Sequence, residues 1–304
     1  MHRLLILLLV CTSVSTHAQQ VADDNYNPPL QQPAYDKGKG PVVFIDEGHH
    51  NFHTRQGRYA PFAKLLERDG YVVKSYSGTF NLSALTKGEI LVISNALHES
   101  NVANWVLPTP SAFTENEIDE VVRWVEQGGS LFLIADHMPM AGAASDLALA
   151  FGFESANGFV FHDHTEGLGC FNIAAGNLVP GPFTEGRDST MRVDHVVTFT
   201  GQAFRIPDEA HSVIQLDSAY TCLLPDTAWV FNDDTHSLNM QRWSQCAYRD
   251  FGKGRVVVCG EAAMFSAQLA GAELMKIGMN DPEADHNYRF LLNIIHWLDA
   301  DMGY

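Results

Sequence analysis

The strongest constraint on the fold is an alternation of short apolar runs with helical patterns between residues 41 and 155. The apolar runs are typical of strands buried on both faces of a sheet, and they read PVVFID, YVVKSYS, EILVISNA and SLFLIAD. Strands that alternate with helices at this spacing predict βαβ units and a parallel sheet. We therefore expect a doubly wound α/β domain with a mostly parallel sheet.

Two helices between these strands have clear signals in the sequence. In residues 59–70, Phe62, Leu65 and Leu66 form one apolar face and Gly70 ends the helix. In residues 113–129, Thr114 is the expected N-cap and Glu117, three positions later, completes a capping box. A third, shorter helix is expected in residues 144–153.

The pattern changes between about residues 156 and 250, which we interpret as a β-rich insertion. Its short stretches are punctuated by Gly, Pro and Asp, and three of them, VDHVVTFTG, HSVIQLDS and TAWVFNDD, are expected strands. GRVVVCGE then returns to the buried-strand type, and residues 285–300 predict a final helix that rejoins the first sheet. In that helix we expect Asp285 as the N-cap and His296 as a core histidine.

The N-terminus indicates export. Residues 1–18 have a basic start, an apolar run and small residues before Gln19, the pattern of a cleaved signal peptide, so we expect a secreted or periplasmic protein. Residues 19–40 are rich in Gln, Pro and Gly and predict a flexible leader or a strap over the surface. The remainder, 41–304, forms the α/β domain with its insertion. No later segment approaches the roughly 20 apolar residues of a membrane span.

Charge and cysteine content narrow the classes of partner. Cleavage removes Arg3 and no acidic residue, so 18 of the 19 basic side chains remain against 36 acidic ones. Such an acidic chain repels phosphate backbones, which argues against a nucleic-acid partner and suits cations or neutral ligands. Four cysteines remain, Cys170, Cys222, Cys246 and Cys259. Cys222 and Cys246 lie in one late segment and could bridge, but four cysteines allow three pairings.

Polar side chains follow four of the predicted strands at the point where each strand ends. These ends read Asp46-Glu47-Gly48-His49, Asn95-Ala96-Leu97-His98, Asp136-His137 and Gly260-Glu261. Ligands of open parallel sheets bind beyond the carboxyl ends of the strands, so we expect one crevice there. Asp, Glu and His are ligands for divalent metals such as Zn²⁺ or Ca²⁺. A bound metal, a metal-free polar pocket and simple helix capping all remain open.

Within this crevice we assign roles to individual residues. Glu47, Asp136 and Glu261 are the expected catalytic carboxylates, and His49, His53 and His137 the expected metal ligands. His49 and His53 are four apart and share a face if their turn is helical, whereas His50 faces solvent. The expected substrate contacts are Arg55, which could instead pair with local acids, and His98, His162, His164 and His286.

Several of these segments resemble a known family. FIDEGHHNFH, the stretch from Phe113 to His137, GRVVVCGEAAMFSAQ and HNYRFLLNIIHWL together resemble DUF4350-type domains of the class I glutamine amidotransferase-like superfamily. The resemblance covers roughly residues 41–155 and 250–300 and implies a flavodoxin-like sheet. True amidotransferases carry a Cys at a strand-to-helix elbow, but Asp136-His137 stands at the corresponding strand end. Glutaminase activity is therefore not expected.

The sequence thus predicts a secreted or periplasmic protein, a metal-assisted hydrolase acting on a neutral or sugar-like substrate at the strand ends. The alternative is a non-catalytic module of the cell envelope that binds a glycan or a protein.

Overall fold

A computed structural model describes residues 20–164 and 167–299 of the 304-residue chain. The predicted signal peptide, residues 1–18, lies outside the described residues. None of the described helices is both long and apolar enough to cross a membrane.

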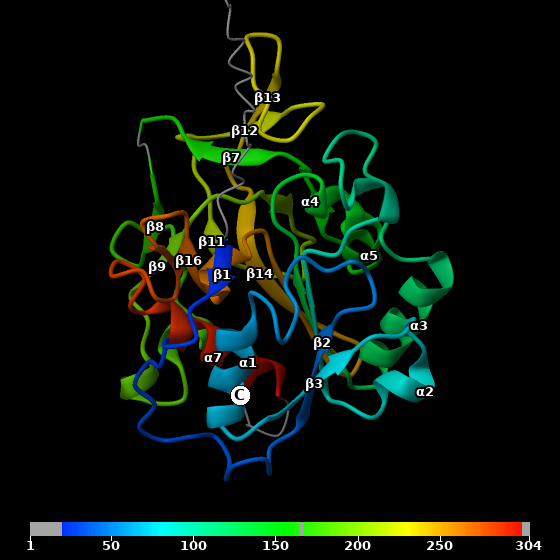
Figure 1. The fold of residues 1–304 in the computed structure, drawn as a ribbon, viewed down its shortest axis with the longest axis vertical. Helices are drawn as coiled ribbons and strands as arrows, with labels where there is room; N and C mark the ends of the chain where they lie inside the picture. The colour runs from blue at the N-terminus through cyan, green and yellow to red at the C-terminus, as the bar shows by residue number, and fades with distance from the viewer. Residues whose placement is uncertain (1–19, 165–166, 300–304) are drawn as a thin grey trace, which may run out of the picture.

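A mixed sheet forms the centre of the molecule (Figure 1). Five parallel strands lie in the order β3-β2-β4-β5-β15, which is 2-1-3-4-5 by position along the chain, one of the common doubly wound orders. Their bounds are β2 Val42–Asp46, β3 Val72–Tyr76, β4 Ile90–Ser94, β5 Ser130–Ile134 and β15 Gly254–Cys259. The predicted parallel sheet is therefore confirmed.

Both faces of this sheet are covered, which explains why its inner strands β4 and β5 are buried along their whole length, whereas the edge strand β3 exposes Lys74 and Ser75. In β5, Phe132 and Ile134 belong to one buried core, whereas Leu131 and Leu133 belong to the other. Helices α1 (Ala60–Arg68) and α7 (Asn287–Leu298) pack on the first core, and α2 (Leu82–Leu85), α3 (Glu115–Glu126) and α5 (Ser145–Ala150) pack on the second (Figure 1). The short helix α4 (Met140–Ala143) precedes α5.

The helix signals in the sequence are confirmed at three positions. The Thr114 side chain accepts the backbone amide of Glu117, and the Glu117 side chain accepts the backbone amide of Thr114, so the capping box of α3 is complete. α1 ends at Arg68, just before Gly70, whose φ of 100° is in the left-handed region that glycine tolerates. In α7 the apolar face is buried, but Asp285 is not its N-cap: His286 occupies that position without a side-chain cap bond.

The predicted insertion divides between the central sheet and smaller sheets. β14 (Ser244–Phe251) runs antiparallel to β15, and β6 (Glu154–Ser155), β10 (Phe204–Arg205) and β11 (His211–Gln215) continue the central sheet beyond it. β7 (Phe159–His162), β12 (Tyr220–Leu224) and β13 (His236–Asn239) form a separate sheet near the top of Figure 1, and β8 (Gly169–Asn172) pairs with β9 (His195–Thr198).

The prediction of a strand in TAWVFNDD is wrong. Residues 227–234 form turns and a loop, in which Trp229 has a left-handed φ of 66° that a strand cannot contain. The apolar side chains that suggested a strand instead face the crevice and the surface around it.

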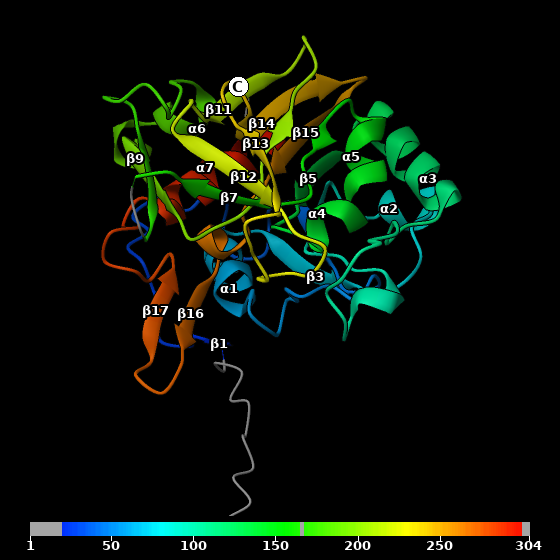
Figure 2. The ribbon, with the colours of Figure 1, turned by 90° about the horizontal axis from the view of Figure 1, so that it is seen from above.

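The segment after Gln19 is a strap rather than a flexible leader. β1 (Gln20–Ala22) pairs with β16 (Ala267–Ala270), which pairs in turn with β17 (Met275–Gly278), and this hairpin projects from the body of the molecule (Figure 2). Further along, the Ala34 amide donates to Asp69 Oδ1 at 2.8 Å. Pairing with β16 and bonds to α1 therefore hold this segment in place, although its composition resembles that of a mobile linker.

Candidate ligand-binding crevice at the strand ends

A cavity of about 280 Å³ lies at the carboxyl ends of the central parallel strands. It receives side chains that follow β4, β5 and β15, which is the edge where ligands bind in this class of sheet. We call it the crevice. Its polar lining is Asn95, Asp136, Glu261, His53, His137, Thr200, Gln20 and Gln268, and its aromatic lining is Phe52, Trp105, Phe199 and Trp229.

Asp136 follows β5 and is positioned by its neighbours on the sheet edge. The Asp136 amide donates to Asn95 Oδ1 at 2.9 Å, and Asp136 Oδ1 accepts the amide of His137 at 2.8 Å. Asn95 has a φ of 50°, a conformation that Asn adopts more readily than most residues and that turns its side chain toward β5. The carboxylate is partly exposed, so it can meet a ligand.

Glu261 follows β15 and is almost completely buried. Burial and the negative charge of Asp136 raise the pKa of Glu261 well above its ordinary range. The backbone amides of Ala263 and Met264 donate to its two oxygens at 2.9 and 2.7 Å and oppose this shift by favouring the charged form. The raised pKa favours the protonated form of Glu261 relative to that of an exposed glutamate.

His137 presents one ring nitrogen for a ligand. Its Nδ1 lies 2.8 Å from the Met138 carbonyl oxygen and must donate to it, so in the neutral ring the lone pair is on Nε2. The ring stacks on Phe159 at 4.3 Å between centroids and meets Trp229 edge-on at 4.9 Å. These contacts fix the ring plane at the wall of the crevice.

His53 is neutral and buried beside the crevice. Burial and the nearby positive charge of Arg58 lower the pKa of His53 to about 3. Its Nδ1 atom is buried and makes no hydrogen bond within the part of the chain that the structure describes. A buried nitrogen without a partner is unusual in a folded protein.

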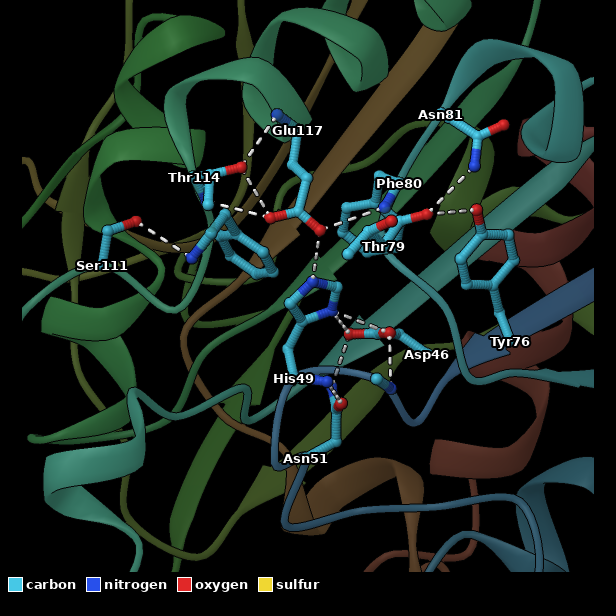
Figure 3. A network of polar contacts seen from close by, with 12 residues as sticks. Asp46, His49, Asn51, Tyr76, Thr79, Phe80, Asn81, Ser111, Thr114 and Glu117 are labelled. Carbon is cyan, nitrogen blue, oxygen red and sulfur yellow. Dashed lines mark hydrogen bonds and ion pairs between the residues drawn. The ribbon is translucent and has the colours of Figure 1, made fainter.

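His49 points away from the crevice. Residues 49–53 are not helical, so the condition under which His49 and His53 would share a face is not met. Figure 3 shows the His49 ring between two carboxylates: Nδ1 lies 2.9 Å from Asp46 Oδ2 and Nε2 lies 3.0 Å from Glu117 Oε1. Both ring nitrogens are thus occupied, and His49 connects the end of β2 to the capping box of α3.

The other residues expected near the first strand stabilise their own loop. Glu47 Oε1 accepts the backbone amide of Arg55 at 2.8 Å, and Glu47 does not line the crevice. Arg55 pairs with Glu67 at 2.7 Å, which is the local pairing that the sequence left open. His50 is exposed, as expected.

The expected substrate contacts do not form one site, and of the histidines among them His162 and His164 contact each other. His98 caps a single turn, η1 (Glu99–Asn101), by accepting the Ser100 amide. His162 lines a neighbouring cavity of about 340 Å³ that shares Phe199 and Thr200 with the crevice, and its Nδ1 accepts the amide of the exposed His164. His286 lies outside both cavities, where it contacts Asp194 and His195.

Sequence reasoning missed the aromatic walls of the crevice and the partners of His49. Trp105 and Trp229 come from long irregular segments whose position no periodicity reveals. Glu117 was predicted to cap a helix, and nothing in its spacing indicates the second bond to His49.

The divalent metal expected in the crevice stays a prediction. Over the described ranges, three metal-ligating donors of separate residues come within 4.8 Å of one another at Asp194, His195 and His286, and not in the crevice.

No protein-family model matches the chain, and no curated protein matches it either. Solved structures with a similar fold include the mmIFT52 N-terminal domain, at 12% identity and a TM-score of 0.57, covering 84% of this chain and 96% of that one. Cytoplasmic protein STM3548 from Salmonella typhimurium has 13% identity and a TM-score of 0.49, covering 85% and 98%. A ThuA-like protein from Bacteroides uniformis has 12% identity and a TM-score of 0.45, covering 90% and 94%. The first likeness shows the fold alone, and the two lower scores support no argument.

Proposed function

We propose that the crevice binds a neutral, sugar-like ligand and hydrolyses it with Glu261 and Asp136 as an acid–base pair. The observation that carries this proposal is the difference between two carboxyl groups at one cavity: Glu261 is buried with a raised pKa, whereas Asp136 is partly exposed. Two neighbouring carboxyl groups in unlike environments are suited to opposite proton-transfer roles.

In this proposal Glu261 donates a proton to the leaving-group oxygen, and Asp136 accepts a proton from the attacking water. The lone pair on Nε2 of His137 and the side-chain amide of Asn95 supply hydrogen-bonding partners for hydroxyl groups. Trp105, Trp229 and Phe52 supply aromatic surfaces for the apolar faces of a sugar ring. A divalent metal in the crevice, Zn²⁺ or Ca²⁺, remains part of the proposal as an assistant to the attacking water.

The wider setting is proposed from the sequence. A signal peptide would place the protein in the periplasm or outside the cell. The strand order supports a flavodoxin-like classification, and we propose on the quoted segments that the chain is a DUF4350-type member of the glutamine amidotransferase-like superfamily. With Asp136-His137 at the elbow, glutaminase activity is not expected.

One observation favours a second function, a non-catalytic glycan-binding module. Both oxygens of Glu261 accept amides of the turn that follows β15, which is what a purely structural carboxylate would do. Trp229 and Phe231 are exposed near the crevice, and aromatic side chains of this kind also serve simple binding.

The test compares binding and turnover on a panel of neutral oligosaccharides and aryl glycosides. We expect Glu261→Gln and Asp136→Asn to lower kcat by about a hundredfold or more while ligand affinity changes little, and Trp229→Ala to weaken binding. Asp146→Asn, an exposed carboxylate outside the crevice, is the matched control. Loss of turnover with a chelator, in the wild type and in His195→Ala alike, would support a metal in the crevice. Binding without turnover would favour the binding module, and the absence of both would overturn the proposal.

A further inference from the structure

Two Asp-His dipeptides meet on the surface, far apart in sequence and outside the crevice. Asp194-His195 leads into β9, and Asp285-His286 leads into α7. Each aspartate contacts the histidine of the other dipeptide: Asp194 Oδ1 lies 3.0 Å from His286 Nδ1, and Asp285 Oδ1 lies 3.0 Å from His195 Nε2. The two imidazole rings stack with their centroids 4.4 Å apart.

Three donor atoms of this cluster gather around one point. Asp194 Oδ1 is 2.6 Å from His195 Nδ1 as well as 3.0 Å from His286 Nδ1, and the donors of the three residues lie within 4.8 Å of one another. Ligands held at about 2.0–2.1 Å around a tetrahedral ion are separated by roughly 3.3 Å, so a small opening of the cluster admits an ion. Two imidazoles and a carboxylate are donors that Zn²⁺ accepts readily.

Asp285 supplies an independent argument for coordination by His195. A metal-binding histidine commonly donates its second ring N–H to a carboxylate, which fixes the tautomer and orients the ring. Asp285 holds His195 Nε2 in this way and leaves His195 Nδ1, the atom nearest Asp194, for an ion.

We propose that Asp194, His195 and His286 bind one divalent transition-metal ion of the zinc class, with Asp285 orienting His195. The side chain of Asp194 is 75% exposed, so the remaining coordination positions face solvent. The ion links β9 to the start of α7, two elements that are distant in sequence, and therefore stabilises the folded state.

Arg289 favours the tautomer of His286 that cannot bind a metal through Nδ1, and this provides a test of the proposal. Its Nη1 atom lies 3.2 Å from His286 Nε2 and can only donate to it. A metal on Nδ1 requires the proton on Nε2, so Arg289 must turn away, and its charge also repels the ion. Arg289 keeps a bond to the Tyr288 hydroxyl through Nε, so this movement does not detach the side chain.

The experiment titrates chelator-stripped, full-length mature protein with Zn²⁺ by calorimetry and with Co²⁺ by visible absorption. We expect a site that depends on the cluster: Tm rises on adding Zn²⁺, and binding at this site is at least about tenfold weaker in His195→Ala and in His286→Ala. His236→Ala, a change at an exposed histidine outside the cluster, should bind as the wild type does. Arg289→Gln should bind Zn²⁺ more tightly, because the glutamine side-chain oxygen can accept a hydrogen bond from the Nε2–H group of His286.

Two results would overturn the proposal. One is Zn²⁺ binding that is equal in His195→Ala, His286→Ala and the wild type. The other is binding that disappears in the crevice variant Asp136→Asn and persists in His195→Ala, which would place the ion in the crevice. Circular dichroism of each variant shows whether it is folded, and the gain expected for Arg289→Gln cannot arise from unfolding.

Discussion

His49 is held between Asp46 and Glu117, and its charge should contribute to stability. Burial lowers the pKa of His49, but the bonds and charges of Asp46 and Glu117 outweigh it, so that the pKa is raised. A raised folded-state pKa means that this contribution is full below the unfolded value of about 6.5 and is lost as the pH rises through the folded value. The stability difference between wild type and His49→Gln should therefore shrink above pH of about 6.5.

Urea unfolding of both proteins between acidic and alkaline pH measures this difference directly. The glutamine variant lacks only the titrating ring. Subtracting its free energy of unfolding from that of the wild type therefore removes the pH dependence that both proteins owe to their other titratable groups. A difference that stays constant across the range would show that the pKa of His49 is the same in the folded and unfolded states and would contradict the prediction.

The crevice residues differ in how far the sequence could predict them. Asp136, His137 and Glu261 directly follow buried parallel strands, so the direction of the chain brings them to one edge. His49 and His53 lie in an irregular loop, where His50 has a left-handed φ of 50°. Because each backbone angle there redirects the next side chain, sequence spacing alone does not predict which of them faces the crevice.

At the level of elements, β14 and β15 bring two cysteines together. Cys246 lies directly opposite Cys259, and their sulfur atoms are 2.7 Å apart as free thiols, so the neighbour of Cys246 across the ladder is Cys259 and not Cys222. Burial and Cys246 raise the pKa of Cys259, which keeps that thiol unreactive once the sheet has formed. A chain that folds in an oxidising compartment should therefore link this pair during folding.

Alkylation of the unfolded, non-reduced protein followed by peptide mapping tests this link. We expect Cys170 and Cys222 to be alkylated, a peptide joined through Cys246 and Cys259, and a loss of about 3 kcal/mol in unfolding free energy on reduction. Cys222→Ser should leave the joined peptide unchanged. Alkylation of all of Cys170, Cys222, Cys246 and Cys259 would contradict the expectation.

Helices with complete local signals could be predicted, whereas the insertion could be predicted only in part: two of its three expected strands are present as β9 and β11. The capping box of α3 and the apolar face of α1 are set by residues within one element, and both are confirmed. The strand wrongly expected in TAWVFNDD has suitable apolar residues, but its place is determined by contacts with distant segments, such as the bridge from Thr227 to Val106.

At the scale of the whole molecule, Asp69 connects three parts of the chain that are distant in sequence: helix α1, the strap and helix α7. It ends α1, accepts the Ala34 amide of the strap through Oδ1, and contacts His296 Nε2 of α7 through Oδ2 at 2.6 Å. Asp69 and His296 are both fully buried, so the removal of either leaves the other without its partner in the core. Such a junction allows the strap to belong to the fold despite its linker-like composition.

We expect Asp69→Ala to lower the free energy of unfolding by about 3 kcal/mol and to speed proteolysis between residues 24 and 40, because His296 loses its buried partner and the strap loses a bond. Urea unfolding and limited proteolysis measure the two effects. Asp36→Ala, an exposed aspartate of the same strap, should change stability by less than about 0.5 kcal/mol. If the strap resists protease in Asp69→Ala as it does in the wild type, β1 and the apolar contacts of Tyr26, Leu30 and Ala34 hold it without the Asp69 junction.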